Sequence, residues 1–418
     1  MKMTTRVVGM IFCALACMTI RPLPIFAASA PSVLADGADV VKKIFGVDVK
    51  ESERWSTPAP TPIAGPSGPG SYRPTGGIDP GRQYHMAALL HDGRVLVAGG
   101  MSSGGLGMLF SAEVYDPSKG GFQSVGRMSV ARNSATATTL PSGKVLVVGG
   151  EMTTPEGFVE LLDTAELFDP STNTFNYASR MATPRELHSA TLLKDGRVLI
   201  AGGEDRAGNA MSSTEIYDSA TGLFHLGGDL ANATYRHEAE LLDDGRVLIV
   251  GGEDITGYAT KVAQIWDPVT GKSHQTGSMG TVRKSLTATK LQDGRVLIAG
   301  GEDNWGHALD SAEIFDPATN RFHPTGRMNL PHASHTATLL NSGKVLIAGG
   351  FDGINGVTGV SELYDPESGT FTQTGTMATP REFFTATRLQ DGEVLVVGGF
   401  TYVLGDFGVV QNCELYAP

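Results

Sequence analysis

Short apolar runs alternate with turn-forming residues along most of the chain, and one unit of this pattern returns many times. Each unit contains a β-branched run that ends in Gly-Gly, and successive pairs are separated by 50, 53, 49, 49, 49 and 49 residues. The pairs begin at Gly99, Gly149, Gly202, Gly251, Gly300, Gly349 and Gly398. A fixed period of this length is typical of repeat architectures, in which stacked units bury a common core.

Every unit predicts four β-strands. An apolar strand, a two-residue turn and a second strand precede each Gly-Gly, as in residues 193–203. The turns are Asp-Gly or Ser-Gly, which supply the positive φ of tight hairpins, and they begin at Asp92, Ser142, Asp195, Asp244, Asp293, Ser342 and Asp391. A third strand ends near an aromatic residue and Asp-Pro, as in residues 113–117, and a turn then leads to the fourth strand. Each unit is therefore expected to form a four-stranded antiparallel sheet.

The seventh unit stops at Pro418, before its fourth strand. Residues 70–82 align without a gap on residues 120–132, which contain the fourth strand of the first unit. The missing strand therefore lies at the N-terminal end of the repeats, an offset that is useful only if the sheets close into a ring. This predicts an all-β fold, a seven-bladed β-propeller of four-stranded antiparallel blades, closed by an N-terminal strand that completes the last blade.

The repeat resembles the kelch motif. The resemblance rests on the Arg-x-x-His opening, as in residues 82–85, on the Gly-Gly ending, and on the Glu-x-Tyr-Asp-Pro strand, and it covers residues 70–418. Kelch propellers serve as partner-binding platforms, as galactose-oxidase-type enzymes and as sugar-acid isomerases. The resemblance therefore implies a fold and leaves the function open.

The N-terminal region carries an export pattern. Lys2 and Arg6 precede an apolar run over residues 7–20, and small residues follow, which predicts a signal peptide over residues 1–30 and a secreted or periplasmic protein. The residues before Cys17 depart from a lipobox, which argues against a lipoprotein signal. Residues 31–69 end in a Pro/Gly-rich stretch and are expected to be a linker, so the propeller domain spans residues 70–418.

Charge and cysteine content narrow the classes of partner. The formal charge of -12 becomes -15 when residues 1–30, which hold three basic and no acidic side chains, are removed. A nucleic-acid partner is therefore not expected, and neither is membrane insertion of the mature form. Cys413 is the one cysteine outside the predicted signal, so no intramolecular disulfide is expected in the mature chain. We expect a monomer.

The loops after the Gly-Gly pairs are the first candidate for a binding surface, because variable loops on a repeated scaffold commonly carry function. Three of them are long, at residues 101–112, 151–165 and 400–413. Candidate ligand-binding aromatic residues in these and neighbouring loops are Phe158, Trp305, Tyr402 and Phe407, with Phe110 and Tyr258 nearby. The alternative is that these aromatic side chains plug the mouth of the ring.

A second candidate is a column of arginines at the start of the first strands, where five guanidinium groups near one axis could hold an anion. It contains Arg82, Arg132, Arg185, Arg283 and Arg381, with Thr234 and His332 in the remaining blades. The alternative is a structural role. Glutamates begin six of the third strands and also follow four Gly-Gly pairs, at Glu151, Glu204, Glu253 and Glu302, so each arginine has a possible carboxylate partner.

Three residues further, four histidines occupy equivalent positions, at His85, His188, His237 and His335. Four imidazoles could gather a metal near the axis. Ala135, Leu286 and Phe384 take this place in the other blades, which favours packed or hydrogen-bonded histidines. We therefore expect no metal and no cofactor.

These observations predict a secreted binding module that engages a protein or glycan ligand through the loop face. The alternative is a carbohydrate-processing enzyme similar to the kelch isomerases that act on sialic acid. Galactose-oxidase-like copper chemistry implies a cysteine cross-linked to a tyrosine and domains flanking the propeller, and the sequence does not supply these features. No catalytic residue is assigned, because the chain shows no Ser-His-Asp signature, phosphate loop or His-Glu-x-x-His motif.

Overall fold

The computed structural model describes residues 70–418 apart from residues 103–106, 155, 355 and 404–405, and it does not describe the side chains of Val403, Asp406 and Phe407. The predicted signal peptide and linker, residues 1–30 and 31–69, lie outside the described residues. Within the described part of the chain, no helix is long and apolar enough to cross a membrane.

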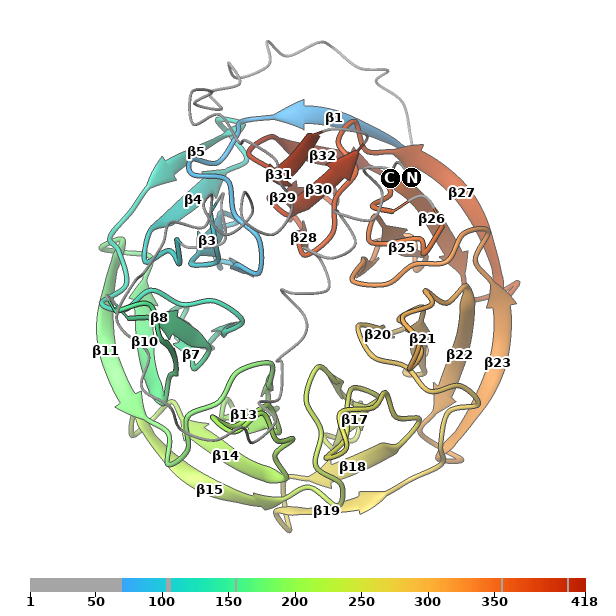
Figure 1. Cartoon of the computed structure of the whole chain (residues 1–418), viewed down its shortest axis with the longest axis horizontal. Coiled ribbons are helices and arrows are strands. Elements are labelled where there is room, and N and C mark those ends of the chain that lie inside the picture. The colour runs from blue at the N-terminus through green and yellow to red at the C-terminus, as the bar shows by residue number, and fades with distance from the viewer. Residues whose placement is uncertain (1–69, 103–106, 155, 355, 404–405) are drawn as a thin grey trace, which may run out of the picture. The chain divides into compact units, whose positions relative to one another are not determined.

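The described residues form a seven-bladed β-propeller, as predicted, and each blade is a four-stranded antiparallel sheet (Figure 1). The first blade contains β2 (Met86–Leu89), β3 (Val95–Ala98), β4 (Ala112–Asp116) and β5 (Gly121–Ser124). The second contains β6 (Thr136–Thr139), β7 (Val145–Val148), β10 (Thr164–Asp169) and β11 (Thr174–Arg180). The third contains β12 (Ser189–Leu192), β13 (Val198–Ala201), β14 (Ser213–Asp218) and β15 (Leu223–Asp229). The fourth contains β16 (Glu238–Leu241), β17 (Val247–Val250), β18 (Ala263–Asp267) and β19 (Lys272–Gln275).

The remaining blades repeat this order from the inner to the outer strand. The fifth contains β20 (Thr287–Lys290), β21 (Val296–Ala299), β22 (Ser311–Asp316) and β23 (Arg321–Arg327). The sixth contains β24 (Thr336–Leu339), β25 (Val345–Ala348), β26 (Val360–Asp365) and β27 (Thr370–Thr376). The seventh contains β28 (Thr385–Arg388), β29 (Val394–Val397), β32 (Cys413–Ala417) and β1 (Ser71–Thr75). Two small hairpins, β8 (Glu151–Thr153) with β9 (Val159–Leu161) and β30 (Phe400–Val403) with β31 (Asp406–Val409), project from the second and seventh blades.

The hydrophobic core is divided among the contacts between neighbouring blades. The second strand of each blade is an apolar tetrapeptide such as Val-Leu-Ile-Ala, and all of its residues are buried. A strand that is covered on both faces needs no polar alternation, which explains these continuous apolar runs. Each of the seven core clusters joins residues of two adjacent blades. The blades are therefore stabilised by stacking around the ring, where apolar surface leaves water.

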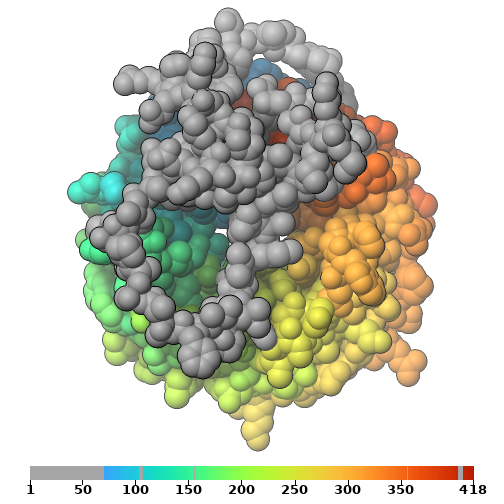
Figure 2. Space-filling model, in the orientation of Figure 1, coloured from blue at the N-terminus to red at the C-terminus, as the bar shows by residue number. Residues whose placement is uncertain are grey.

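The ring closes through β1, as the offset of the repeats predicts. β1 pairs antiparallel with β32 over five residues, from Ser71 opposite Ala417 to Thr75 opposite Cys413. The Tyr72 hydroxyl shares a 2.7 Å hydrogen bond with Ser361 Oγ of the sixth blade, and its ring packs on Tyr416 at 5.0 Å. The first strand thus holds the last blade and also contacts the blade before it. Figure 1 shows the blades following one another around the ring in chain order, and the part of the surface that is open to view in Figure 2 follows the same order.

Candidate functional site

The mouth of the propeller is built from the same two positions in every blade. The residue that follows Gly-Gly forms an antiparallel bridge with a residue just before the first strand. We call these bridged pairs the mouth residues. They are Gln83 with Met101, Asn133 with Glu151, Glu186 with Glu204, Tyr235 with Glu253, Lys284 with Glu302, Ala333 with Phe351, and Glu382 with Phe400. Because the backbone positions repeat, the side chains at these positions decide what the mouth can bind.

Backbone hydrogen bonds between neighbouring blades support the mouth. Between each bridge and the following strand, one non-glycine residue has a φ of 51–54°. In five of the seven blades its N–H donates to the carbonyl of its counterpart in the preceding blade, as in Leu187 to Ser134 at 3.3 Å and Arg236 to Leu187 at 3.0 Å. These left-handed residues are Tyr84, Ser134, Leu187, Arg236, Ser285, Ser334 and Phe383. Strain of this kind persists only where the surrounding structure imposes it, and here the blade-to-blade bonds do so.

Carboxyl groups occupy one half of the mouth, in the second to fifth blades. Glu253 is the best-satisfied of them, because its carboxylate accepts from Tyr235 Oη at 3.0 Å and from Arg236 Nη1 at 3.2 Å, and Lys284 Nζ lies 3.6 Å away. Asn133 Nδ2 donates to Glu151 Oε1 at 2.9 Å. The carboxyl groups of this half belong to Glu151, Glu186, Glu204, Glu253 and Glu302. Five acids against two bases leave this half acidic.

Glu186 differs from the other acids of this half. Burial, followed by the charges of Glu151 and Glu204, raises the pKa of Glu186 to about 8. Its carboxyl group has no hydrogen-bond or ion-pair partner among the described residues. A carboxylic acid that keeps its proton at neutral pH can donate a hydrogen bond or a proton, whereas an ionised carboxylate beside it accepts one.

Aromatic and other apolar side chains occupy most of the other half of the mouth, which also contains Gln83 and the buried Glu382. Tyr84 and Phe383 stack across the first and seventh blades, with ring centroids 4.3 Å apart and planes inclined by 26°. Phe351 and Phe400 are half-buried mouth residues of the sixth and seventh blades, and Met101 takes the same place in the first. The mouth therefore has a mainly aromatic wall, in the sixth, seventh and first blades, and an acidic wall with most of the carboxyl groups, in the second to fifth blades.

The aromatic residues singled out from the sequence lie on the loops of different blades. Phe158 is 70% exposed between β8 and β9 of the second blade, and Trp305 is 79% exposed in the fifth blade. Tyr402 lies on β30, opposite Phe407 on β31, whose side chain is outside the described residues. The structure thus brings Tyr402 and Phe407 into one hairpin and leaves Phe158 and Trp305 on separate parts of the rim.

The five arginines are fully buried inside the blades. Arg185 is typical: Nη1 donates to the carbonyls of Gly202 at 2.8 Å and Ser213 at 2.9 Å, and Nη2 donates to Ser213 Oγ at 3.0 Å and Glu215 Oε1 at 3.1 Å. The equivalent pairs are Arg82 with Glu113, Arg132 with Glu166, Arg283 with Glu313 and Arg381 with Glu414, at 2.7–3.5 Å. With no exposed guanidinium surface, these arginines hold the frame of each blade, and an anion at the mouth would not reach them.

The structure corrects the sequence interpretation of which glutamates pair with the five arginines. The paired carboxylates all begin third strands, and they also accept backbone N–H groups from the segment that joins two blades, as Glu215 does from Ala182 at 2.7 Å. The glutamates that follow Gly-Gly pairs are mouth residues, and among the described residues the five arginines pair with other glutamates. The sequence did carry a signal for the acidic half, because such glutamates occur in four consecutive blades and not in the other three.

The four histidines join neighbouring blades. Each Nε2 lies within 2.9–3.1 Å of a hydroxyl oxygen on the inner strand of the preceding blade, as His85 does with Thr385 and His188 does with Thr136. Burial lowers the pKa of both His85 and His188 to about 3, so these rings are neutral at physiological pH. Among the described residues, no group of three or more His, Cys, Asp or Glu side chains is arranged to hold a metal ion.

Comparison with known proteins agrees with this architecture. A model of the kelch motif matches residues 291–329. The chain carries a kelch motif on a kelch-type β-propeller. The kelch propeller is similar to the solved structure of YjhT, with a TM-score of 0.56 and 14% identity over 71% of this chain and 99% of that chain.

A second similar structure is a fungal alcohol oxidase of the AA5 family, solved in complex with copper. Its TM-score is 0.65, with 16% identity over 84% of this chain and 76% of that chain. At these identities the likeness concerns the fold alone. No curated protein matches the sequence of this kelch propeller.

Proposed function

We propose that this kelch propeller is an exported carbohydrate-binding module whose ligand sits at the mouth. The observation that carries the proposal is the division of the mouth into an aromatic wall and a carboxylate wall. Sugars have apolar C–H faces and a rim of hydroxyl groups. The Tyr84–Phe383 stack, Phe351 and Phe400 offer surfaces for the first, and the glutamates accept hydrogen bonds from the second.

The charge of the mouth selects among sugars. Arg236 and Lys284 already lie against Glu253, and the frame arginines are buried with their own carboxylates. The mouth therefore has an excess of negative charge, which repels a sugar acid and favours a neutral or amino sugar. A ring of exposed arginines would have favoured an anionic ligand, whereas the acidic mouth favours a neutral or cationic one.

The experiment is calorimetric titration of the full chain with neutral, amino and acidic oligosaccharides. We expect binding of a neutral or amino sugar that weakens about tenfold or more in Phe351→Ala and in Glu204→Gln, because truncation of a central contact typically costs about 2 kcal/mol. Glu160→Gln, an exposed glutamate on β9, is the matched control and should bind as the unaltered protein does. If no sugar binds, or if the mouth variants bind normally, the carbohydrate proposal fails and a protein ligand is sought.

Glu186 favours a second candidate function, a sugar-processing enzyme. Opening of a cyclic sugar hemiacetal requires an acid and a base; Glu186, with a pKa of about 8, would supply the acid, and the neighbouring Glu151 or Glu204 would supply the base. Exchange between the anomers of a bound reducing sugar, followed by NMR, should then be faster with the protein, should slow as the pH rises above about 8, and should be lost in Glu186→Gln. Unchanged exchange in that variant leaves the protein as a binding module only.

A further inference from the structure

The fourth blade departs from the arginine frame at two positions that belong together. Thr234 stands where five blades have arginine, and Gln264 stands where the third strand of every other blade begins with glutamate. The sixth blade departs differently, because His332 replaces arginine, keeps Glu362 within 3.5 Å and donates its Nδ1–H to the carbonyl of Gly349 at 2.7 Å. The fourth blade alone has therefore lost both the cation and its carboxylate.

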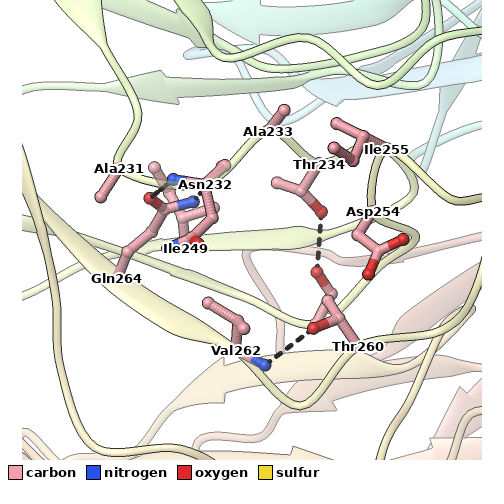
Figure 3. A pocket seen from close by; sticks show the side chains of 11 residues that line it. Ala231, Asn232, Ala233, Thr234, Ile249, Asp254, Ile255, Thr260, Val262 and Gln264 are labelled. Carbon is pink, nitrogen blue, oxygen red and sulfur yellow. Dashed lines mark hydrogen bonds between the residues drawn. The ribbon is translucent and has the colours of Figure 1, made fainter.

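These two replacements leave a pocket at the loop end of the fourth blade. Its volume is about 310 Å³, at the lower end of the range for small-ligand sites, about 300–1,000 Å³. Figure 3 shows Thr234, Gln264 and Asp254 around it, and the exposed Ile255 stands at its rim. The lining residues are Ala231, Asn232, Ala233, Thr234, Ile249, Gly251, Asp254, Ile255, Thr260, Val262 and Gln264.

The polar groups that line the pocket are mainly acceptors. The Val262 carbonyl, which corresponds to the Ser213 carbonyl that binds Arg185, accepts only the Gly251 N–H at 3.0 Å among the described residues. Gln264 is bonded within the chain: its Nε2 donates to the Asn232 carbonyl at 2.8 Å, and its oxygen accepts the Asn232 N–H at 3.0 Å and the Ser273 hydroxyl at 3.2 Å. The lining contains no lysine or arginine.

Asp254 supplies a carboxylate to the same lining. Its Oδ1 accepts the Thr256 N–H at 2.8 Å, and Oδ2 takes part in none of the hydrogen bonds among the described residues. In this pocket the carboxylate belongs to a loop residue, Asp254, whereas in the other blades it belongs to a glutamate of the third strand.

We propose that this pocket binds the guanidinium group of an arginine side chain that another molecule supplies. Five blades of the same protein show how the fold holds a guanidinium at this place, on two carbonyls, a hydroxyl or amide oxygen and a carboxylate. The fourth blade keeps both carbonyls, of which that of Gly251 also accepts the Thr234 hydroxyl at 2.9 Å. The Thr260 hydroxyl, which accepts the Val262 N–H at 3.2 Å, and the Asp254 carboxylate complete the polar lining that we assign to the guanidinium. Ala233, Ile249 and Val262 give apolar walls for the flat faces of the guanidinium and the methylene stem.

The test uses Nα-acetyl-arginine methylamide, with the lysine and citrulline analogues as probes of charge and shape. We expect the full chain to bind the arginine probe at least about tenfold more tightly than either analogue, because a planar cation with five donors matches several acceptors at once. Free arginine is a further arm: tighter binding than the blocked probe would identify the free amino acid as the source, and equal or weaker binding would identify an arginine of a peptide.

The decisive variant is Thr234→Arg with Gln264→Glu, which rebuilds the internal pair seen in five blades. It should remove binding of the arginine probe while the melting temperature stays at or above that of the unaltered protein. His332→Arg, which builds the same pair in the sixth blade, is the matched control and should leave probe binding unchanged. If the double variant is poorly folded, Asp254→Asn should still weaken the arginine probe about tenfold. Equal binding of the three probes, or full binding by these fourth-blade variants, would overturn the proposal.

Discussion

The buried arginine–glutamate pairs should dominate the stability of individual blades, and the third blade offers the clearest test. Arg185 makes four hydrogen bonds from a fully buried guanidinium, and Glu215 holds both Arg185 and the Ala182 N–H. Removing one partner of a buried pair leaves an uncompensated charge and costs about 3–5 kcal/mol. We expect this loss in Arg185→Thr and also in Glu215→Gln.

The double variant Arg185→Thr, Glu215→Gln copies the fourth blade, where Thr234 donates to the Gly251 carbonyl and Gln264 donates to the Asn232 carbonyl, so that both are hydrogen-bonded without a charge. It should cost less than the sum of the two single variants by about 2–3 kcal/mol, because neither side chain then leaves a buried charge alone.

Equilibrium unfolding in urea, followed by the emission of the fully buried Trp266, measures these differences. For a domain of roughly 350 residues, an unfolding entropy near 2.1 cal/mol/K per residue makes 3–5 kcal/mol equal to a fall of roughly 4–7 °C in melting temperature. A cost below about 1 kcal/mol in either single variant, or additive costs in the double variant, would show that the pair does not carry the frame.

Two further predictions concern the inner strand of the fourth blade and the closure of the ring. Burial, with the charge of Glu240, raises the pKa of Glu238 to about 8, so the favourable contribution of its protonated form is complete below about 4.5 and is lost as the pH rises towards 8. Glu238→Gln should therefore match the unaltered protein at pH 5 and melt at a higher temperature at pH 9, and equal melting at pH 9 would contradict the pKa. Deleting residues 70–78 should sharply lower the melting temperature in calorimetry, because β1 then no longer pairs with β32. Tyr72→Ala alone should cost about 3–5 kcal/mol as a truncated buried aromatic residue, and an unchanged melting curve in both variants would refute closure by β1.

The sequence specifies the blades because their determinants are local. The Asp-Gly and Ser-Gly turns, the apolar second strands and the aromatic third strands each act within a few residues, and together they predicted the strands and the ring. The alignment of residues 70–82 with residues 120–132 also predicted the pairing of β1. The hairpins β8–β9 and β30–β31 were not predicted, because these long loops show no clear alternation and their strands form over the end of a blade.

The mouth and the pocket depend on contacts between distant residues, and so the sequence could indicate them only in part. The repeat places glutamates after Gly-Gly and at the start of third strands, but only the fold shows that Glu204 faces the mouth while Glu215 holds Arg185. Likewise, comparison of equivalent positions in the repeats shows that Thr234 takes the place of an arginine and Gln264 the place of a glutamate. Their joint effect, a pocket rather than a repacked interior, follows from the neighbouring side chains.

The pairing of β1 with β32 also orders the events of folding. The paired residues Ser71 and Ala417 are separated along the sequence by almost the whole repeat region. The two inner strands of a blade, in contrast, are neighbours in the sequence and are joined by a tight turn. Closing a loop of about 340 residues costs roughly 3–4 kcal/mol more chain entropy than closing a hairpin. We therefore expect the seventh blade to be completed after the other blades have stacked and brought the two distant strands together. Until that moment the edge of β32 lies open, which makes the interval before ring closure the stage at which the chain is most exposed to pairing with a second copy of itself.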